Sequence, residues 1–145
     1  DRDLRATCGG LSHPSRVVLP NQSAMFLDLF KATDDLTEVG DPALWRRAIS
    51  RLDDVAALLQ THARSAPVLI QDELRHTVAL AEFALRRGLA RRYPLGAELP
   101  RREAWHEIRC EHERLWRWRS REGGLEQSCA FFDQVERNLS GGATA

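Results

Sequence analysis

Apolar residues recur roughly every three to four positions along most of this chain, which is the pattern of helices with one buried face. The pattern is clearest in residues 105–139, where Gly123 and Gly124 separate two apolar stripes. The first stripe is Trp105, Ile108, His112, Leu115, Trp116 and Arg119, and the second is Leu125, Ser128, Cys129, Phe132, Val135 and Leu139. We expect Gly123 to be the left-handed residue that ends one helix and Gly124 to begin the next. So short a connection predicts an antiparallel pair.

Two further helices begin where a capping residue is followed by proline, at Asp41-Pro42 and at Ser65-Ala66-Pro67. The helix from Pro42 to about Thr61 carries a single stripe: Trp45, Ala48, Ile49, Leu52, Val55, Ala56 and Leu59. The next helix, from Pro67 to about Arg91, is apolar over most of its circumference. Such a helix belongs in the middle of a domain, so we expect the helices around it to pack on it from several sides.

The N-terminal part of the chain is less regular. Residues 1–20 contain Gly9-Gly10, Pro14 and Pro20, so we expect an extended lead-in, followed by a helix over about residues 21–34. The apolar face of that helix would be formed by Met25, Phe26, Leu29 and Phe30. The predicted fold is therefore all-α, an antiparallel bundle of about five helices in residues 21–139, with a flexible tail at 140–145.

Composition narrows the function classes. The 145 residues suffice for one domain with a core, and 21 basic residues balance 21 acidic ones, which argues against a nucleic-acid binder. No apolar run approaches the roughly 20 residues of a membrane span, and the charged first residues are unlike a signal peptide. Three cysteines without pairing logic favour reduced thiols and a cytoplasmic location. Residue 1 is Asp rather than Met, so we expect a piece of a longer protein.

Two groups of side chains could in principle serve catalysis or metal binding, but ordinary structural roles explain them better. Asp72 and Glu73 are adjacent, so on a helix they diverge and fit a solvated helix start better than an acid–base pair. His106, Cys110 and Glu113 share a turn spacing, but zinc needs three or four convergent ligands and no paired motif supports it. We therefore predict no catalytic residues, no metal and no cofactor in this chain.

The end of the helix that begins near Trp105 holds more specific candidates. His112 and Arg119 lie on its apolar face, either with satisfied partners at the core edge or reaching across an interface. Trp116 and Trp118 point to nearly opposite sides, and an exposed Trp118 would indicate a second packing surface. We assign a docking edge to Arg117, Trp118, Arg119 and Arg121. A pocket lined by His76, His112 and Arg119, with clearly perturbed titration, would instead favour a small enzyme or ligand-binding bundle.

The segment from Glu113 to Ser128 resembles the C-terminal region of bacterial family 20 glycoside hydrolases, which are β-N-acetylhexosaminidases. The residues that carry the resemblance are Leu115, Trp116, Arg119, Arg121, Gly123, Gly124, Leu125 and Ser128. Ser120 and Glu122 depart from it, where Asn and Pro are usual. A second, weaker likeness covers Cys8-Gly9-Gly10 to Asn21-Gln22-Ser23, which resembles the connection from a barrel into such a helical tail. The family's catalytic Asp-Glu pair lies at the end of a barrel strand, and Asp72-Glu73 does not match that motif.

The resemblance implies a non-catalytic helical accessory domain, cut from a larger glycoside hydrolase. Its partner would be the catalytic barrel or a second subunit. The alternative is a stand-alone helical module for protein interaction or homodimerisation. Self-association in dilute solution would favour the module, whereas poor solubility that a missing barrel cures would favour the accessory domain.

Overall fold

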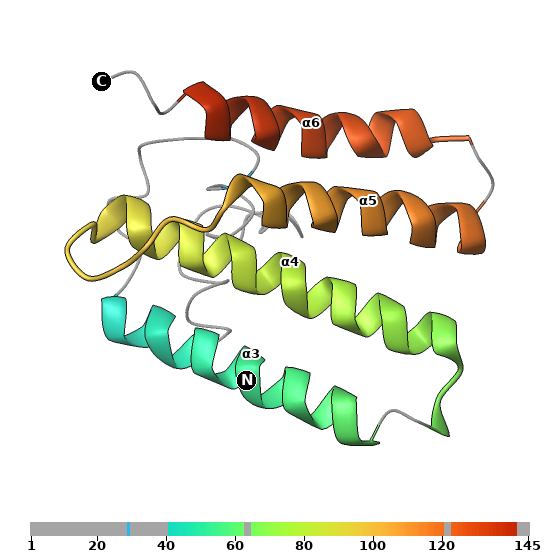
Figure 1. Cartoon of the computed structure of the whole chain (residues 1–145), viewed down its shortest axis with the longest axis horizontal. Helices are drawn as coiled ribbons and strands as arrows, with labels where there is room; N and C mark the ends of the chain where they lie inside the picture. Colours follow the sequence, from blue (N-terminus) through green and yellow to red (C-terminus); the bar gives the residue numbers. More distant parts are fainter. Residues whose placement is uncertain (1–28, 30–40, 63–64, 121–122, 142–145) are drawn as a thin grey trace, which may run out of the picture.

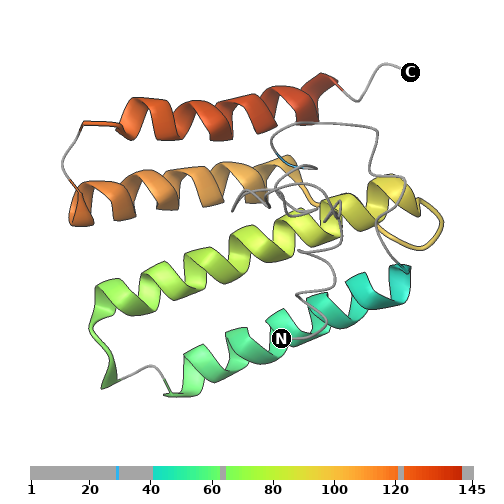
Figure 2. The ribbon, with the colours of Figure 1, turned by 180° about the vertical axis from the view of Figure 1, so that it is seen from behind.

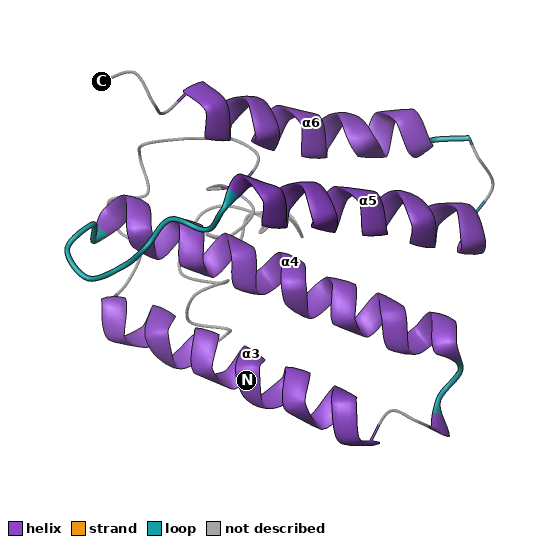
Figure 3. Ribbon diagram, in the orientation of Figure 1, coloured by secondary structure: helices purple, strands orange, loops and turns teal. Residues whose placement is uncertain are grey.

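The computed structural model describes residues 29, 41–62, 65–120 and 123–141. These residues form the helices α3 (Pro42–His62), α4 (Val68–Arg92), α5 (Arg102–Arg119) and α6 (Leu125–Gly141). No strand occurs in this described part, which confirms the predicted all-α class (Figure 3). The lead-in at 1–20, the helix predicted over 21–34 apart from Leu29, and residues 142–145 lie outside the described residues. A bundle of five helices therefore stays a prediction.

The helices lie side by side in chain order, and each runs opposite to the one before it (Figure 1). The view from behind shows the same order (Figure 2). Most packing joins sequence neighbours: α3 with α4, α4 with α5, and α5 with α6. The central place predicted for α4 is correct with respect to α3 and α5. The main packing partner of α6 is α5, and α6 meets α4 in the hydrophobic core that both share with α5.

The first hydrophobic core joins α3 to α4. It consists of Trp45, Ala48, Ile49, Leu52, Leu85 and Leu89. The start of α3 is fixed by Asp41, whose Oδ1 accepts a hydrogen bond from the Ala43 amide at 2.8 Å. The Trp45 indole lies against Gly88, where an added Cβ would come within 2.4 Å of the ring. Glycine therefore allows the two helices to approach at this point.

The second core joins α4, α5 and α6. It consists of Leu29, Phe83, Ala84, Trp105, Ile108, Phe132 and Val135. Trp105 is completely buried, with ring centroids 5.0 Å from Phe83 and 5.2 Å from Phe132. Its indole N–H donates to the Phe132 carbonyl oxygen at 2.9 Å. One tryptophan therefore contributes both apolar area and a satisfied polar link between α5 and α6.

Burial is uneven along the helices. The buried residues of α4 all lie in its second half, from Phe83 to Ala90. In its first half Ile70 and Leu74 remain 47% and 44% exposed. The apolar stripe of α3 also becomes less buried along the helix, since Leu52 is buried but Val55 is exposed. The end of the molecule where α3 finishes and α4 begins is therefore the less closely packed end.

The turn between α5 and α6 corrects one prediction. Gly124, and not Gly123, has the left-handed backbone, with φ of 92°. Its carbonyl oxygen accepts the Ser128 amide at 2.9 Å, so Gly124 does begin α6 as expected. The special conformation thus serves the start of α6 rather than the end of α5. Helix α6 continues to Gly141, slightly beyond the predicted end at Leu139.

Candidate functional site

A groove of about 480 Å³ opens between the first half of α4 and the second half of α5. We call it the distal groove. Its apolar lining is Ile70, Leu74, Leu115 and Trp116, and its polar lining is Glu73, His76, Thr77, His112, Arg119 and Ser120. The structure therefore brings His76, His112 and Arg119 to one groove, the arrangement considered from the sequence.

His112 is held by contacts on several sides. Its ring stacks on Phe132 with centroids 4.5 Å apart, and its Nε2 lies 2.8 Å from the Ser128 hydroxyl. The His76 ring lies 5.8 Å away, across the α4–α5 seam. Burial, the neighbouring His76 and the Arg109 cation hold the pKa of His112 below its usual value. The neutral imidazole is therefore the favoured form.

His76 is also half-buried. Burial lowers the pKa of His76, while the Glu111 carboxylate opposes this effect. Its Nδ1 is buried without a hydrogen-bond partner among the described residues.

The pair formed by Ser128 and His112 resembles the start of a hydrolytic arrangement, which needs a third group to orient the imidazole. Within the described part of the chain, no carboxylate is hydrogen-bonded to either histidine ring. In addition, the His112 ring is fixed between Phe132 and Trp116. The hydrogen bond between His112 and Ser128 therefore fits a polar link between α5 and α6 better than it fits a catalytic nucleophile with its base.

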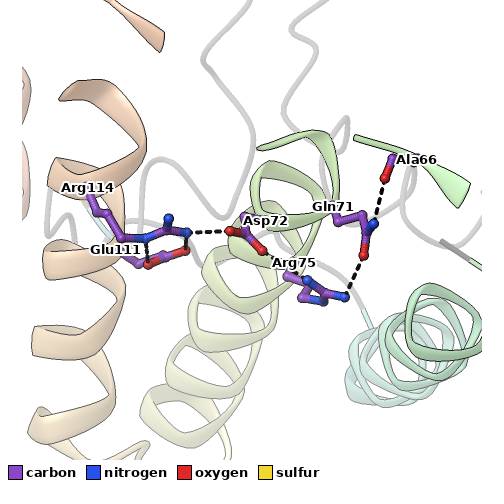
Figure 4. A network of polar contacts seen from close by, with 6 residues as sticks. All are labelled: Ala66, Gln71, Asp72, Arg75, Glu111 and Arg114. Carbon is purple, nitrogen blue, oxygen red and sulfur yellow. Dashed lines mark hydrogen bonds and ion pairs between the residues drawn. The ribbon is translucent and has the colours of Figure 1, made fainter. Parts of the chain in front are cut away.

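An ion-pair network joins α4 to α5 (Figure 4). Arg114 of α5 bonds Glu111 on its own helix and donates to Asp72 of α4 at 2.6 Å. Both carboxylates raise the pKa of Arg114. Asp72 also accepts from Arg75 at 3.0 Å. Because all of these groups have partners, the network joins the two helices and leaves little charge for a ligand.

The adjacent acids diverge as predicted. Asp72 turns to Arg114, whereas Glu73 pairs with Arg119 at the rim of the distal groove. The two carboxylates therefore do not converge on one bond, and each serves as half of a contact between α4 and α5.

The predicted docking edge is divided by the helix geometry. Arg117 pairs with Glu113 at 2.6 Å, and Arg119 turns instead to Glu73. Trp118 is 54% exposed, with the Arg114 guanidinium 5.6 Å from its ring centroid. Arg121 lies outside the described residues. Arg117 and Arg119 thus have different ion-pair partners, and the docking edge itself stays a prediction.

The structure brings together only two of the three considered metal ligands. His106 Nε2 lies 3.5 Å from Cys110 Sγ on the exposed side of α5. Glu113 bonds Arg109 and Arg117 instead. In the described ranges, no group of three or more His, Cys, Asp or Glu side chains could hold a metal ion. Likewise, none of the described helices is long and apolar enough to cross a membrane.

A second groove, of about 380 Å³, was missed by the reading of the sequence. We call it the proximal groove. Its apolar residues are Ala79, Phe83, Pro100, Ala104 and Ile108, and its charged or polar ones are Arg75, His76, Glu82, Arg86, Glu107 and Glu111. The available signal was the spacing of Ala104 and Ile108 beside Glu103, Glu107 and Glu111, which places a small apolar strip next to an acidic one.

Comparisons with known protein families, with curated proteins and with solved structures find nothing that matches this chain. The family 20 resemblance therefore rests on its own short segments. The described residues of the main one have local structural roles: Leu115 is buried, Trp116 lines the distal groove and Gly124 begins α6. These local roles explain why the segment forms the end of α5, a turn and the start of α6, and they require no family relationship.

Proposed function

We propose that this chain is a non-catalytic helical domain that packs against another folded protein surface through the distal groove. The observation that supports this best is the exposure of Ile70 and Leu74, at 47% and 44%, beside the apolar wall formed by Leu115 and Trp116. Covering such side chains is favourable in free energy, and a partner surface can provide that cover. The Glu73–Arg119 pair would then belong to a polar rim.

The partner we propose is the one that the resemblance implies, a catalytic barrel of the family 20 type on the same polypeptide. The half-buried His112 favours this role over catalysis, because it is held by Phe132 and Ser128. Neither His112 nor His76 has an orienting carboxylate in the described part. A cytoplasmic location remains part of the proposal, and the free thiols of Cys110 and Cys129 support it.

A homodimer is the second candidate. The rim of the distal groove carries one acidic and one basic residue, Glu73 and Arg119, which currently pair with each other. In a twofold contact each could pair with its counterpart on the other copy, since both surfaces are then identical. The formal net charge of zero also leaves little repulsion between copies.

Photo-crosslinking in the native gene product tests this proposal. A photoreactive phenylalanine analogue replaces Leu74 in the groove, and in a control protein it replaces Leu95, which is 93% exposed in the α4–α5 connection. We expect Leu74 to give a defined crosslink and Leu95 to give none. A crosslink to a barrel segment of the same polypeptide supports the accessory domain.

A crosslink to the same helices in a second copy would favour the dimer instead. If the Leu74 position crosslinks no more than the Leu95 position, the docking proposal fails. A blot of the source extract gives an independent check, because a gene product near the 16.5 kDa of this chain leaves no room for a barrel.

A further inference from the structure

The proximal groove has a shallow apolar floor. Phe83 and Ile108 are buried there, while the half-buried Ala79 and Ala104 leave space above them, because their side chains end at Cβ. On α4, Ala79 and Phe83 project away from Ile70 and Leu74 on the helical wheel, so the two grooves have different apolar residues. His76 is the one residue that lines both grooves.

The charges around this floor are not balanced. The basic residues of the rim are already paired, Arg75 with Asp72 and Arg86 with Glu82. On the α5 side, Glu107 lines the groove, and Glu103 lies just outside the lining, one residue before the lining residue Ala104. Both glutamates are exposed and have no ion pair or hydrogen bond with the described residues. They are one helical turn apart and continue toward Glu111. The groove thus combines an apolar floor with unpaired negative charge along one edge.

We infer that the proximal groove binds a basic amphipathic helix of a partner protein. Aliphatic side chains of that helix would cover Ala79 and Ala104, and its Lys or Arg side chains would face Glu103 and Glu107. A helix fits because cations one turn apart match the spacing of the two glutamates when the helices lie side by side. The inference goes beyond the proposed function, which uses Ile70 and Leu74 of the distal groove, although His76 lines both grooves.

Charge complementarity argues against an occupant from this chain's own N-terminal region. Residues 21–35 contain Asp28, Asp34 and Asp35 but only one basic residue, Lys31. This segment would bring negative charge to a negative edge, which is unfavourable. A basic helix has the matching charge.

The test uses the full chain and a labelled synthetic helix of leucine and lysine, with leucines on one face. Two further peptides test the contributions of charge and of apolar contact. One has glutamate in place of lysine, and the other has serine in place of leucine. We expect fluorescence anisotropy to show binding of the Leu/Lys peptide only. The double variant Glu103→Lys/Glu107→Lys should weaken that binding by about tenfold, since each contact becomes repulsive.

The matched control is Glu98→Lys/Glu126→Lys, which changes the net charge equally at exposed glutamates of the α4–α5 connection and of α6. It should leave affinity unchanged. The inference is overturned if the Leu/Lys peptide does not bind, if both double variants weaken it equally, or if the Leu/Glu peptide binds as well. If the chain alone self-associates and Glu103→Lys/Glu107→Lys abolishes this, the occupant is a second copy and not a basic helix.

Discussion

The Trp45 ring occupies the space directly above Gly88, so α3 and α4 touch where neither could accept another carbon atom. Gly88→Ala should therefore destabilise the protein, although alanine is the better helix former by about 1 kcal/mol. We expect overpacking by about 1–3 kcal/mol to exceed that gain. Urea unfolding followed by circular dichroism measures the difference. In a Trp45→Leu background the same change should become neutral or stabilising, and a stabilised Gly88→Ala single variant would contradict the close contact.

Trp105 gives a second prediction. Trp105→Phe removes the indole donor to the Phe132 carbonyl and part of a completely buried ring, so the free energy of unfolding should fall by about 2–4 kcal/mol. Trp118→Phe on the same helix is the control, because that ring is 54% exposed and should change stability little. Equal effects of the two substitutions would show that α5 and α6 do not pack as described.

Leu29 tests whether the N-terminal part contributes to the core. Its side chain is 2% exposed and belongs to the cluster around Trp105. Leu29→Ala should lower the free energy of unfolding by about 2–4 kcal/mol, as expected for a buried leucine. Leu95→Ala, at a position 93% exposed, should have almost no effect. A neutral Leu29→Ala would place Leu29 outside the folded core.

The histidine pair predicts a loss of stability in mild acid. The folded-state pKa values of His76 and His112 lie below the usual 6.5, so the unfolded chain binds more protons below that pH. Their contribution is complete above pH 6.5 and is lost as the pH falls through the folded-state values. Urea unfolding between pH 7.5 and 5.5 measures this slope. The double variant His76→Gln/His112→Gln should flatten it, and an unchanged slope in this variant would contradict the assignment to the histidine pair.

Thiol labelling tests the burial of α6. Burial raises the pKa of the Cys129 thiol, which is 7% exposed, whereas Cys110 is exposed. Because the thiolate is the reacting form, Cys129 should react slowly with a disulfide reagent in the folded protein. A Cys8→Ser variant makes the two phases easy to assign, and Cys110→Ser should remove the fast one. Rapid reaction of Cys129 would indicate that α6 detaches readily from α5.

Helix positions were predictable because each is determined by nearby residues. The stripe from Trp45 to Leu52 and the Asp41-Pro42 start predict α3 almost to the residue, and structure confirms both. Which helices pack against each other was harder to predict from the sequence. An apolar circumference shows that α4 has several neighbours, but it does not say which ones. The exposure of Ile70 and Leu74 likewise depends on how far α3 and α5 cover α4, which no local pattern contains.

The groove residues were suggested from the sequence, but their proximity depends on how α4 packs against α5. His76, His112 and Arg119 share a groove because the register of α4 against α5 places them together, and the sequence could only suggest this. The docking edge stays a prediction. Consecutive helix residues lie about 100° apart, so Arg117 and Arg119 project to different sides of α5. Their partners, Glu113 and Glu73, confirm the divergence.

The sequential packing of the helices has a consequence for how the chain folds. Because the main contacts of α3, α4, α5 and α6 join sequence neighbours, the described part closes mainly short loops as it forms. Chains dominated by such local contacts fold rapidly, in microseconds to milliseconds. The outer helices can also open without separating the inner pair, so amide hydrogen exchange should be fastest in α3 and α6 and slowest around Phe83 and Trp105.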